Sequence, residues 1–347
     1  MRKIKLLLSS FVFIIAAKSQ DIHFSQFNSN PLTINPALTG VFNGDQRGVL
    51  NYKDQWTSFG EGYKTYSVSF DMRTMNNKWK NGCLGVGLNI FNDVAGSSKM
   101  STTKALLSVS GIIDINKQHQ FIAGIQGGMV QNSLNSSNLI WDDQYVNGSY
   151  NSNVSSLDYV NAEPFYYADM SAGISWNYVT GQSTISSYDA TRIQAGVSYH
   201  HINRPTLEFR NNNTDVLYSK LIFHSTAHYG IKNSRLAIRP GLLVVVQGSS
   251  NEIVAGATLR YRMKESSRYT GYFSEQALSL GGHYRWNDAF IPSVWYEISN
   301  LAIGVSYDVN LSPLRAASNL KGGMEISLRF INPNPFTYQS RSKPSFN

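Results

Sequence analysis

Fourteen segments in which apolar residues alternate with polar or small ones constrain the fold of this chain more than any other feature. From Leu301 to Asp308, for example, Leu, Ile, Val and Tyr alternate with Ala, Gly, Ser and Asp. Because successive side chains of a strand point to opposite faces, each segment has one oily face and one polar or small face. The segments span 47–55, 63–72, 82–92, 102–114, 119–131, 165–178, 191–201, 220–231, 235–247, 252–262, 276–286, 289–298, 300–309 and 321–330.

The length and number of these segments favour a membrane barrel. A soluble sandwich would show the same alternation, but its strands average about five or six residues, whereas a tilted membrane-spanning strand needs about 9–11. Single-chain bacterial outer-membrane barrels also have an even number of strands. We therefore predict an all-β fold, a transmembrane antiparallel up-and-down β-barrel of about 14 strands. The 20 Tyr and 17 Phe, with only 15% charged residues, agree with such a barrel and its aromatic girdles.

The two ends of the chain lie outside this pattern. Residues 1–19 have a basic start, an apolar run from Leu6 to Ala17 and small residues at Ala17 and Ser19, which predicts a signal peptide cut before Gln20. Residues 20–46 contain two Asn-Pro steps, which favour turns over strand, and we expect an ordered arm or plug there. Residues 47–330 are the predicted barrel, and residues 331–347 are a C-terminal tail.

Charge and cysteine content narrow the classes of function. The full chain carries a net charge of +8, of which four charges lie in the predicted signal peptide, and the remaining Lys and Arg are scattered. A nucleic-acid-binding protein would gather them in a stripe, so we expect no nucleic-acid partner. The single cysteine, Cys83, cannot form an internal disulfide.

Connection lengths suggest an orientation. With the N- and C-termini in the periplasm, the odd-numbered connections face outward, and outer-membrane barrels have long outer loops. The two longest gaps, 132–164 and 202–219, are both odd-numbered. The first is rich in Asn, Ser, Asp and Tyr, which fits either a solvated cap or a binding surface.

The sequence lacks a recognisable catalytic, cofactor or metal motif. His224 and His228 would lie roughly 13 Å apart on a strand, too far to share a metal, and the neighbouring pair His200 and His201 should point to opposite faces. The serine motif around Ser198 lacks the second glycine of a hydrolase elbow. We expect no enzyme, with an outer-membrane esterase as the remote alternative.

Charges inside the predicted strands fall on the polar face and should line the lumen, because Arg or Lys facing lipid at the midplane costs about 2–4 kcal/mol. They form a hydrated, salt-bridged interior, a channel wall or a surface on which an inserted segment packs. Glycines such as Gly85 and Gly87 let the barrel curve or a plug approach. The strand charges are Arg192, Arg239, Arg260, Asp308, Glu325 and Arg329.

Two blocks of motif lie at opposite ends of the mature chain. The first is Gln20-Asp21-Ile22-His23-Phe24-Ser25-Gln26-Phe27 with Asn35-Pro36-Ala37-Leu38-Thr39-Gly40, followed by Arg47, Asn51-Tyr52-Lys53 and Gln55-Trp56. The second is Ser306-Tyr307-Asp308-Val309-Asn310-Leu311-Ser312, then Ala317-Ser318-Asn319 and Gly322 to Leu328. Together the two blocks resemble the PorP/SprF family of the type IX secretion system of Bacteroidetes. Lys53 and Met324 stand where family members often carry Arg and an aromatic residue.

The resemblance implies an outer-membrane protein that supports the secretion or surface display of another protein. Its expected partners are a secreted cell-surface protein with a gliding-type C-terminal domain, other type IX secretion components and outer-membrane lipid. A core secretion role and an adhesin-specific role in gliding remain open, and a diffusion or uptake channel is the alternative. The expected partner-binding residues are Asn310, Leu311, Ser312, Pro313, Leu314, Arg315, Ala317, Ser318 and Asn319. Those expected to line the lumen or pack the arm are Phe24, Asn35, Pro36, Arg47, Trp56, Arg239, Arg260, Asp308 and Glu325.

Overall fold

The computed structural model describes most of the predicted arm and barrel. The described residues are 23–56, 62–75, 81–96, 98–135, 141–146, 148–151, 153–154, 163–180, 190–207, 215–264, 275–313 and 315–332. The predicted signal peptide and the tail from residue 333 onward lie outside them.

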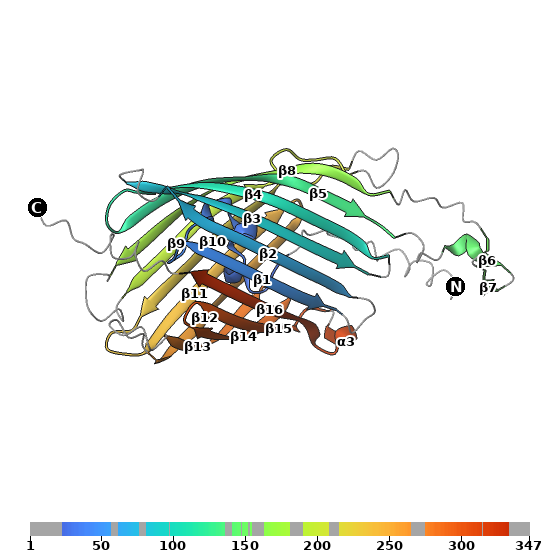
Figure 1. Ribbon diagram of the computed structural model, residues 1–347. Helices are drawn as coiled ribbons and strands as arrows, with labels where there is room; N and C mark the ends of the chain where they lie inside the picture. Colours follow the sequence, from blue (N-terminus) through green and yellow to red (C-terminus); the bar gives the residue numbers. More distant parts are fainter. Residues whose placement is uncertain are drawn as a thin grey trace, which may run out of the picture.

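Fourteen antiparallel strands form one closed barrel, which confirms the predicted fold class (Figure 1). Each strand pairs with its neighbours in sequence order, and β1 closes the barrel against β16. A separate hairpin of β6 (Tyr145–Val146) and β7 (Ser149–Tyr150) lies in the connection between β5 and β8. The barrel strands are β1 (Gln46–Gln55), β2 (Tyr63–Thr74), β3 (Gly82–Ala95), β4 (Met100–Asp114), β5 (His119–Ser133), β8 (Phe165–Thr180), β9 (Thr191–His200), β10 (Lys220–Gly230), β11 (Leu236–Gln247), β12 (Ser250–Lys264), β13 (Gln276–Arg285), β14 (Ala289–Ile298), β15 (Leu301–Asn310) and β16 (Lys321–Asn332).

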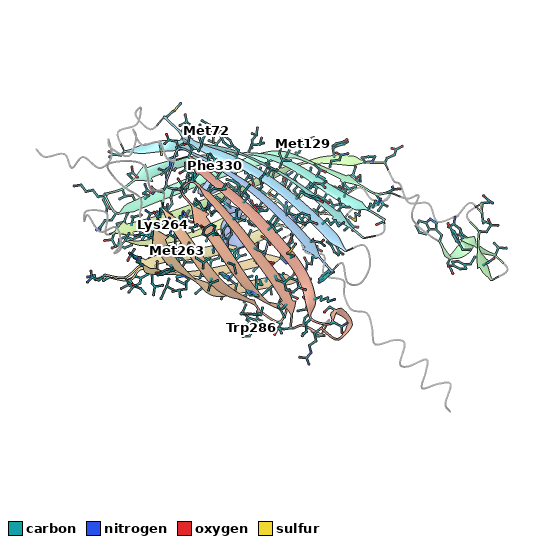
Figure 2. All side chains as sticks on the ribbon, turned by 60° about the horizontal axis from the view of Figure 1, so that its bottom comes forward. Met72, Met129, Met263, Lys264, Trp286 and Phe330 are labelled. Carbon is teal, nitrogen blue, oxygen red and sulfur yellow. The ribbon has the colours of Figure 1, made fainter. Side chains whose placement is uncertain are left out.

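The outer face of the barrel is apolar. Leu107 and Ile125, for example, are 63% and 66% exposed, and Figure 2 shows Met72, Met129, Trp286 and Phe330 projecting outward. A water-soluble protein rarely exposes a continuous apolar surface of this extent, whereas a transmembrane barrel requires it. Exposed aromatic side chains occur near both strand ends, as expected of interfacial girdles: Tyr63, Tyr66, Tyr166, Tyr284, Trp286 and Phe290 at one end, and Phe121, Trp176, Tyr229, Tyr261, Tyr296 and Phe330 at the other.

The two ends of the barrel differ in the lengths of their connections. The basal end is the one where β1 begins and β16 finishes, and the loop end is the opposite one. The two longest connections, 134–164 and 201–219, leave the strands at the loop end, and so does the connection of β15 to β16, which contains α3 (Arg315–Ser318). The basal end carries shorter connections, such as 115–118 and 231–235.

The chain before β1 folds inside the barrel (Figure 1). Its short helices are η1 (Phe27–Ser29), α2 (Pro31–Ile34) and η2 (Pro36–Leu38). The two prolines occupy first helical positions, where the missing N–H costs nothing. We call residues 23–45 the arm. It runs from the loop end, where His23 lies near Glu252, to the basal end, where the N–H of Asp45 donates to the carbonyl of Asn332.

The arm contributes residues to both hydrophobic clusters of the core. Phe27 and Ile34 pack with the wall residues Ile222, Leu243 and Val254. Ala37 packs in a second cluster, whose other members are Cys83, Ile112 and Ile122. Because the wall turns its large apolar side chains mostly outward, these contacts need an inserted segment to exist at all.

One local prediction is wrong. His200 and His201 do not point to opposite faces, because β9 ends at His200 and His201 adopts a left-handed backbone conformation with φ of 56°. Both side chains are buried. The Nδ1 of His201 lies 2.9 Å from a carboxylate oxygen of Asp169, on the inner face of β8.

No helix among the described residues is long and apolar enough to cross a membrane.

Candidate functional site: the arm-filled lumen and its two ends

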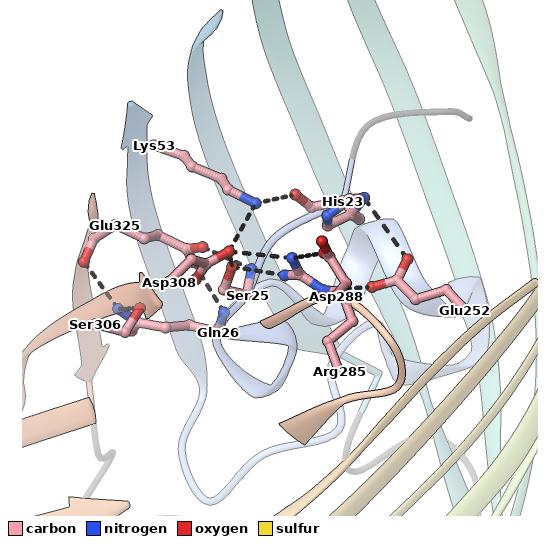
Figure 3. A network of polar contacts seen from close by, with 10 residues as sticks. All are labelled: His23, Ser25, Gln26, Lys53, Glu252, Arg285, Asp288, Ser306, Asp308 and Glu325. Carbon is pink, nitrogen blue, oxygen red and sulfur yellow. Dashed lines mark hydrogen bonds and ion pairs between the residues drawn. The ribbon is translucent and has the colours of Figure 1, made fainter. Parts of the chain in front are cut away.

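Two carboxylates of the last strands bind the start of the arm (Figure 3). Glu325 accepts hydrogen bonds from the backbone N–H groups of Ser25 and Gln26, at 2.7 and 3.2 Å. The hydroxyl of Ser25 donates to Asp308 at 2.7 Å, and the amide of Gln26 donates to the Ser306 hydroxyl at 3.0 Å. All five residues are buried. Hydrogen bonds to a buried carboxylate are stronger than neutral ones, so this contact fixes the position of the arm.

The guanidinium of Arg285 contacts the carboxylate of Asp308 and three other groups. Its guanidinium lies 3.1 Å from Asp308, 2.9 Å from Asp288 and 3.1 Å from Glu252, and it donates to the Ser25 hydroxyl at 2.8 Å. The Arg285 side chain is 4% exposed. Arg285 therefore joins carboxylates of β12, of the connection between β13 and β14, and of β15. It also contacts the arm.

Lys53 is the second cation of this network. Its ammonium donates to the carbonyl of His23 at 3.0 Å and lies 3.9 Å from Asp308, and its side chain is 2% exposed. Together Lys53 and Arg285 face four carboxylates, those of Glu252, Asp288, Asp308 and Glu325. Glu325 accepts hydrogen bonds from the backbone N–H groups that the arm presents.

Asn35 anchors the middle of the arm. Its side-chain amide donates to the carbonyls of Ile174 and Val197 at 3.0 and 3.2 Å and lies 3.1 Å from the His224 ring. Its side-chain oxygen accepts from the N–H of Ala37 at 2.9 Å and so caps η2. Asn35 is fully buried. Its hydrogen bonds hold the arm against the wall and stabilise the start of η2 within the arm.

Two glycines let the arm lie close to the wall, one facing its backbone and one facing the side chain of Asn35. A Cβ at Gly124 would lie 2.5 Å from the carbonyl carbon and oxygen of Pro36, and a Cβ at Gly173 would overlap the side-chain oxygen of Asn35. Any other residue would hold the arm away from β5 and β8. At these positions inward-facing glycines allow the arm to approach the wall, as the sequence predicts. Gly85 and Gly87 also lie close to Thr39 of the arm.

Arg47 anchors the basal end of the arm. Its guanidinium makes two hydrogen bonds to Asp71, at 2.9 and 2.7 Å, and one to the carbonyl of Leu38 at 3.2 Å. Asp71 also accepts from the N–H of Gly40 at 2.7 Å. The planar two-point geometry is one that arginine provides and lysine does not.

Of the residues expected to pack the arm or line the lumen, the structure brings most together. Phe24, Asn35 and Pro36 are buried in the arm itself, and Arg47, Asp308 and Glu325 bind it. Arg239 and Arg260 line the lumen in a separate ion-pair cluster around Glu297. Trp56 is the exception, because its ring packs edge-on against Tyr63 at the loop end, 5.3 Å between centroids.

Sequence reasoning missed Ser25, Gln26 and Arg285 as members of this site. Arg285 could have been found, because it occupies an inward position in the alternation of 276–286. The two arm residues offered no such signal. They bind mainly through their backbone N–H groups and the Ser25 hydroxyl. The alternation of apolar and polar residues does not predict such contacts.

The expected partner-binding segment lies at the loop end. Asn310 ends β15 and donates to the Ser318 hydroxyl and to the carbonyl of Lys321 at 3.3 and 3.1 Å. Leu311 is 45% exposed, and Ser312 is buried. Pro313, Arg315 and Asn319 are exposed, whereas Leu314 and the side chain of Ala317 lie outside the described part. This segment is thus anchored at Asn310 and presents an apolar and a basic side chain outward.

A cavity of about 90 Å³ lies beside the arm in the loop-end half of the lumen. The arm contributes Phe24 and Phe27 to its lining, and the wall contributes Lys104, Lys220 and Glu252 among others. The wall side of the lining is mixed, because it also includes the apolar side chains of Phe91, Leu106 and Ile222.

The Ser198 hydroxyl and the His200 ring, 3.0 Å apart, both face the lumen and both contact the carbonyl of Ile34. His224 and His228 have different partners, Asn35 and Arg239. In the part of the chain that the structure covers, no three His, Cys, Asp or Glu side chains gather where they could hold a metal ion.

Fold and site together define a transmembrane β-barrel whose lumen holds the protein's own N-terminal arm. The family model for the type IX secretion system membrane protein PorP/SprF matches residues 16–330, and the chain belongs to this family. It is accordingly an outer-membrane β-barrel and a secretion or transport component.

Solved structures of other barrels are more distant. The translocator domain of the autotransporter NalP from Neisseria meningitidis is 9% identical, with 82% of this chain and 88% of that chain covered and a TM-score of 0.38. The CymD monoaromatic hydrocarbon channel is 11% identical, with 88% and 93% covered and a TM-score of 0.46. The β-domain of the Bordetella autotransporter BrkA is 8% identical, with 83% and 99% covered and a TM-score of 0.35. The search of curated proteins found no match.

Proposed function

We propose that this protein is a scaffold of the type IX secretion system that docks a secreted cell-surface protein at its loop end and supports the secretion or display of that protein. The observation that carries the proposal is the arm. It fills the lumen and is held along its length by Glu325, Asp308, Asn35 and Arg47. An interior committed to the protein's own chain leaves the ends of the barrel for binding.

We assign the loop end to the cell surface and the basal end to the periplasm. The two longest connections leave the loop end, and outer-membrane barrels have long outer loops and short periplasmic turns. This orientation places the end of β16 in the periplasm. In this orientation His23 lies at the cell-surface end of the barrel. The residues before His23, for which we expect a periplasmic N-terminus, lie outside the described part of the chain.

The segment 310–319 is the proposed docking surface. Its base is fixed by the hydrogen bonds of Asn310, so Leu311 and Arg315 are presented from an ordered position. Interfaces gain from a fixed apolar or arginine side chain because little side-chain entropy is lost on binding. The proposed partner is a secreted adhesin with a gliding-type C-terminal domain, through which the barrel would serve gliding motility.

Substitution of this segment should release the partner. We expect the double variant Leu311→Asp/Arg315→Glu to weaken partner binding by about 30-fold or more, the effect of losing one interface hot spot of about 2 kcal/mol. The measurement is the amount of secreted adhesin that co-purifies with the barrel from detergent extracts. The matched control is Ile115→Asp/Lys232→Glu, which makes the same changes at exposed positions of the basal end.

Equal recovery of the adhesin with both double variants would remove the docking role of residues 310–319. Deleting the gene tests the wider proposal, since the adhesin should then disappear from the cell surface. A surface-displayed adhesin in the deletion strain would contradict docking by this protein.

A further inference from the structure

Three rings form a cluster on the outer face of the barrel at its basal end. His119 begins β5, and Trp176 and Tyr178 lie near the end of the neighbouring strand β8, where Tyr178 pairs directly with His119. The ring centroid of His119 lies 5.7 Å from that of Trp176 and 5.0 Å from that of Tyr178, and the latter two are 6.2 Å apart. Because cross-strand ring contacts stabilise a sheet, the cluster has a fixed position on the wall.

The cluster faces the membrane and not the rim. Trp176 occupies an outward position in the alternation of β8, and it is 37% exposed. It lies four residues before Thr180, where β8 ends, which is about 13 Å along a strand. Aromatic residues near the ends of membrane strands lie at the level of the lipid headgroups. The molecules that contact this cluster are therefore lipids.

A hydrogen bond distinguishes the cluster from an ordinary aromatic girdle. The indole N–H of Trp176 donates to the Nδ1 of His119 at 3.2 Å. An indole nitrogen can only donate, so Nδ1 is the acceptor, and the N–H of the neutral imidazole is at Nε2. Trp176 thus uses its own donor within the cluster, and His119 presents an N–H donor in its place.

The turn before β5 adds a positive charge beside the rings. Lys117 is exposed and lies two residues before His119. The turn is ordered, because the side-chain oxygen of Asn116 accepts from the backbone N–H groups of Gln118 and His119 at 2.9 and 2.8 Å. An ammonium group and an imidazole N–H both donate, which suits phosphate oxygens. The faces of the rings of Trp176 and Tyr178 attract cations instead.

We propose that this cluster binds the headgroup of a phospholipid that carries both a phosphate and an ammonium group. The phosphate accepts hydrogen bonds from the Nε2 of His119 and from Lys117, and the ammonium lies against the ring of Trp176. The acyl chains then lie on Phe121 and Ile174, which are 40% and 49% exposed on the outer face beside the cluster. A soluble phosphate compound would lack this apolar contact, so the wall favours a lipid as the occupant.

The test is native mass spectrometry of the purified full-length barrel in detergent, titrated with phosphatidylethanolamine or with phosphatidylglycerol. Both lipids have the phosphate, and phosphatidylethanolamine alone has the ammonium. We expect the first phosphatidylethanolamine to bind about 10-fold more tightly, the effect of one cation–π contact at a partly desolvated site. Trp176→Leu should reduce this preference to about 2-fold or less, while an apolar side chain still faces the lipid.

The matched control is Trp286→Leu at the loop end. Trp286 is 64% exposed and packs edge-on against Tyr284, so this variant also removes an outward tryptophan that contacts another ring. It should keep the preference of the wild-type protein. An equal loss of preference in the Trp176→Leu and Trp286→Leu variants would assign the effect to interfacial tryptophans in general and would overturn the proposal.

His119→Phe tests the phosphate contact separately. It keeps a ring in the cluster and removes the N–H donor, so both lipids should bind about 10-fold more weakly, the effect of one lost hydrogen bond. Unchanged affinity for both lipids in this variant would overturn the proposal, and so would equal affinity of the wild-type protein for the two lipids. Displacement of bound lipid by soluble phosphoethanolamine at equal concentration would exclude a lipid as the occupant. These results do not depend on adhesin docking at the loop end.

Discussion

Replacing Arg285 by alanine is expected to lower the free energy of unfolding by about 3–5 kcal/mol, the cost of removing one partner from a buried ion pair. Arg285 is buried and lies within 3.1 Å of Glu252, Asp288 and Asp308. Without it, these carboxylates stay in the lumen with Lys53 as the remaining cation of the network. The variant should also lose the hydrogen bond to Ser25 and with it part of the hold on the arm.

The measurement is equilibrium unfolding of the detergent-folded barrel in urea. Arg262→Ala is the matched control, because the Glu275 carboxylate that Arg262 contacts at 3.2 Å is 38% exposed. A pair of this kind contributes about 0–1 kcal/mol. If Arg285→Ala were no more destabilising than Arg262→Ala, the network would not hold the arm in the way described.

Substituting Gly124 by alanine is expected to dislodge the middle of the arm while leaving the barrel closed. The added Cβ would lie 2.5 Å from the backbone of Pro36, which is closer than any stable contact, so the arm must shift. Overpacking of this kind costs about 1–3 kcal/mol. Because it acts on the arm alone, local opening of the arm should become about 5- to 150-fold more frequent.

Hydrogen–deuterium exchange reports this opening through the amides of Leu38 and Thr39, which donate to the carbonyls of Asn35 and Pro36. The control is Gly111→Ala on the neighbouring strand β4, where a Cβ would meet nothing within 4 Å. Faster exchange in the arm with Gly124→Ala and unchanged exchange with Gly111→Ala is the expected pair of results. Identical exchange in both variants would mean that the arm does not rest on β5.

The barrel could be predicted from sequence because its determinants are local. Alternation fixes which side chains face lipid, and it needs no knowledge of the partner strand. Each predicted segment became one strand of the barrel, and the ends moved by three residues at most. Glu325 and Asp308 were recognised as lumen charges for the same reason, since each occupies an inward position in a clear alternation.

The path of the arm could not be predicted, because its contacts are between residues far apart in sequence. Ser25 and Glu325 are 300 positions apart, and their pairing depends on the register of the whole barrel. The sequence of residues 23–46 contains no signal which predicts that the arm starts at the loop end and crosses to the basal end. The left-handed turn at His201 was hidden for a different reason, since a non-glycine residue with positive φ has no dependable sequence signal.

If the arm closes the lumen, the protein acts as a scaffold and not as a pore. The most direct test of this closure is the electrical conductance of the purified wild-type protein in a planar lipid bilayer. We predict insertion without a steady ionic current, because Asn35, Arg47 and Glu325 hold the arm across the lumen. A stable, ohmic conductance from the wild-type protein would contradict the account and favour a diffusion channel.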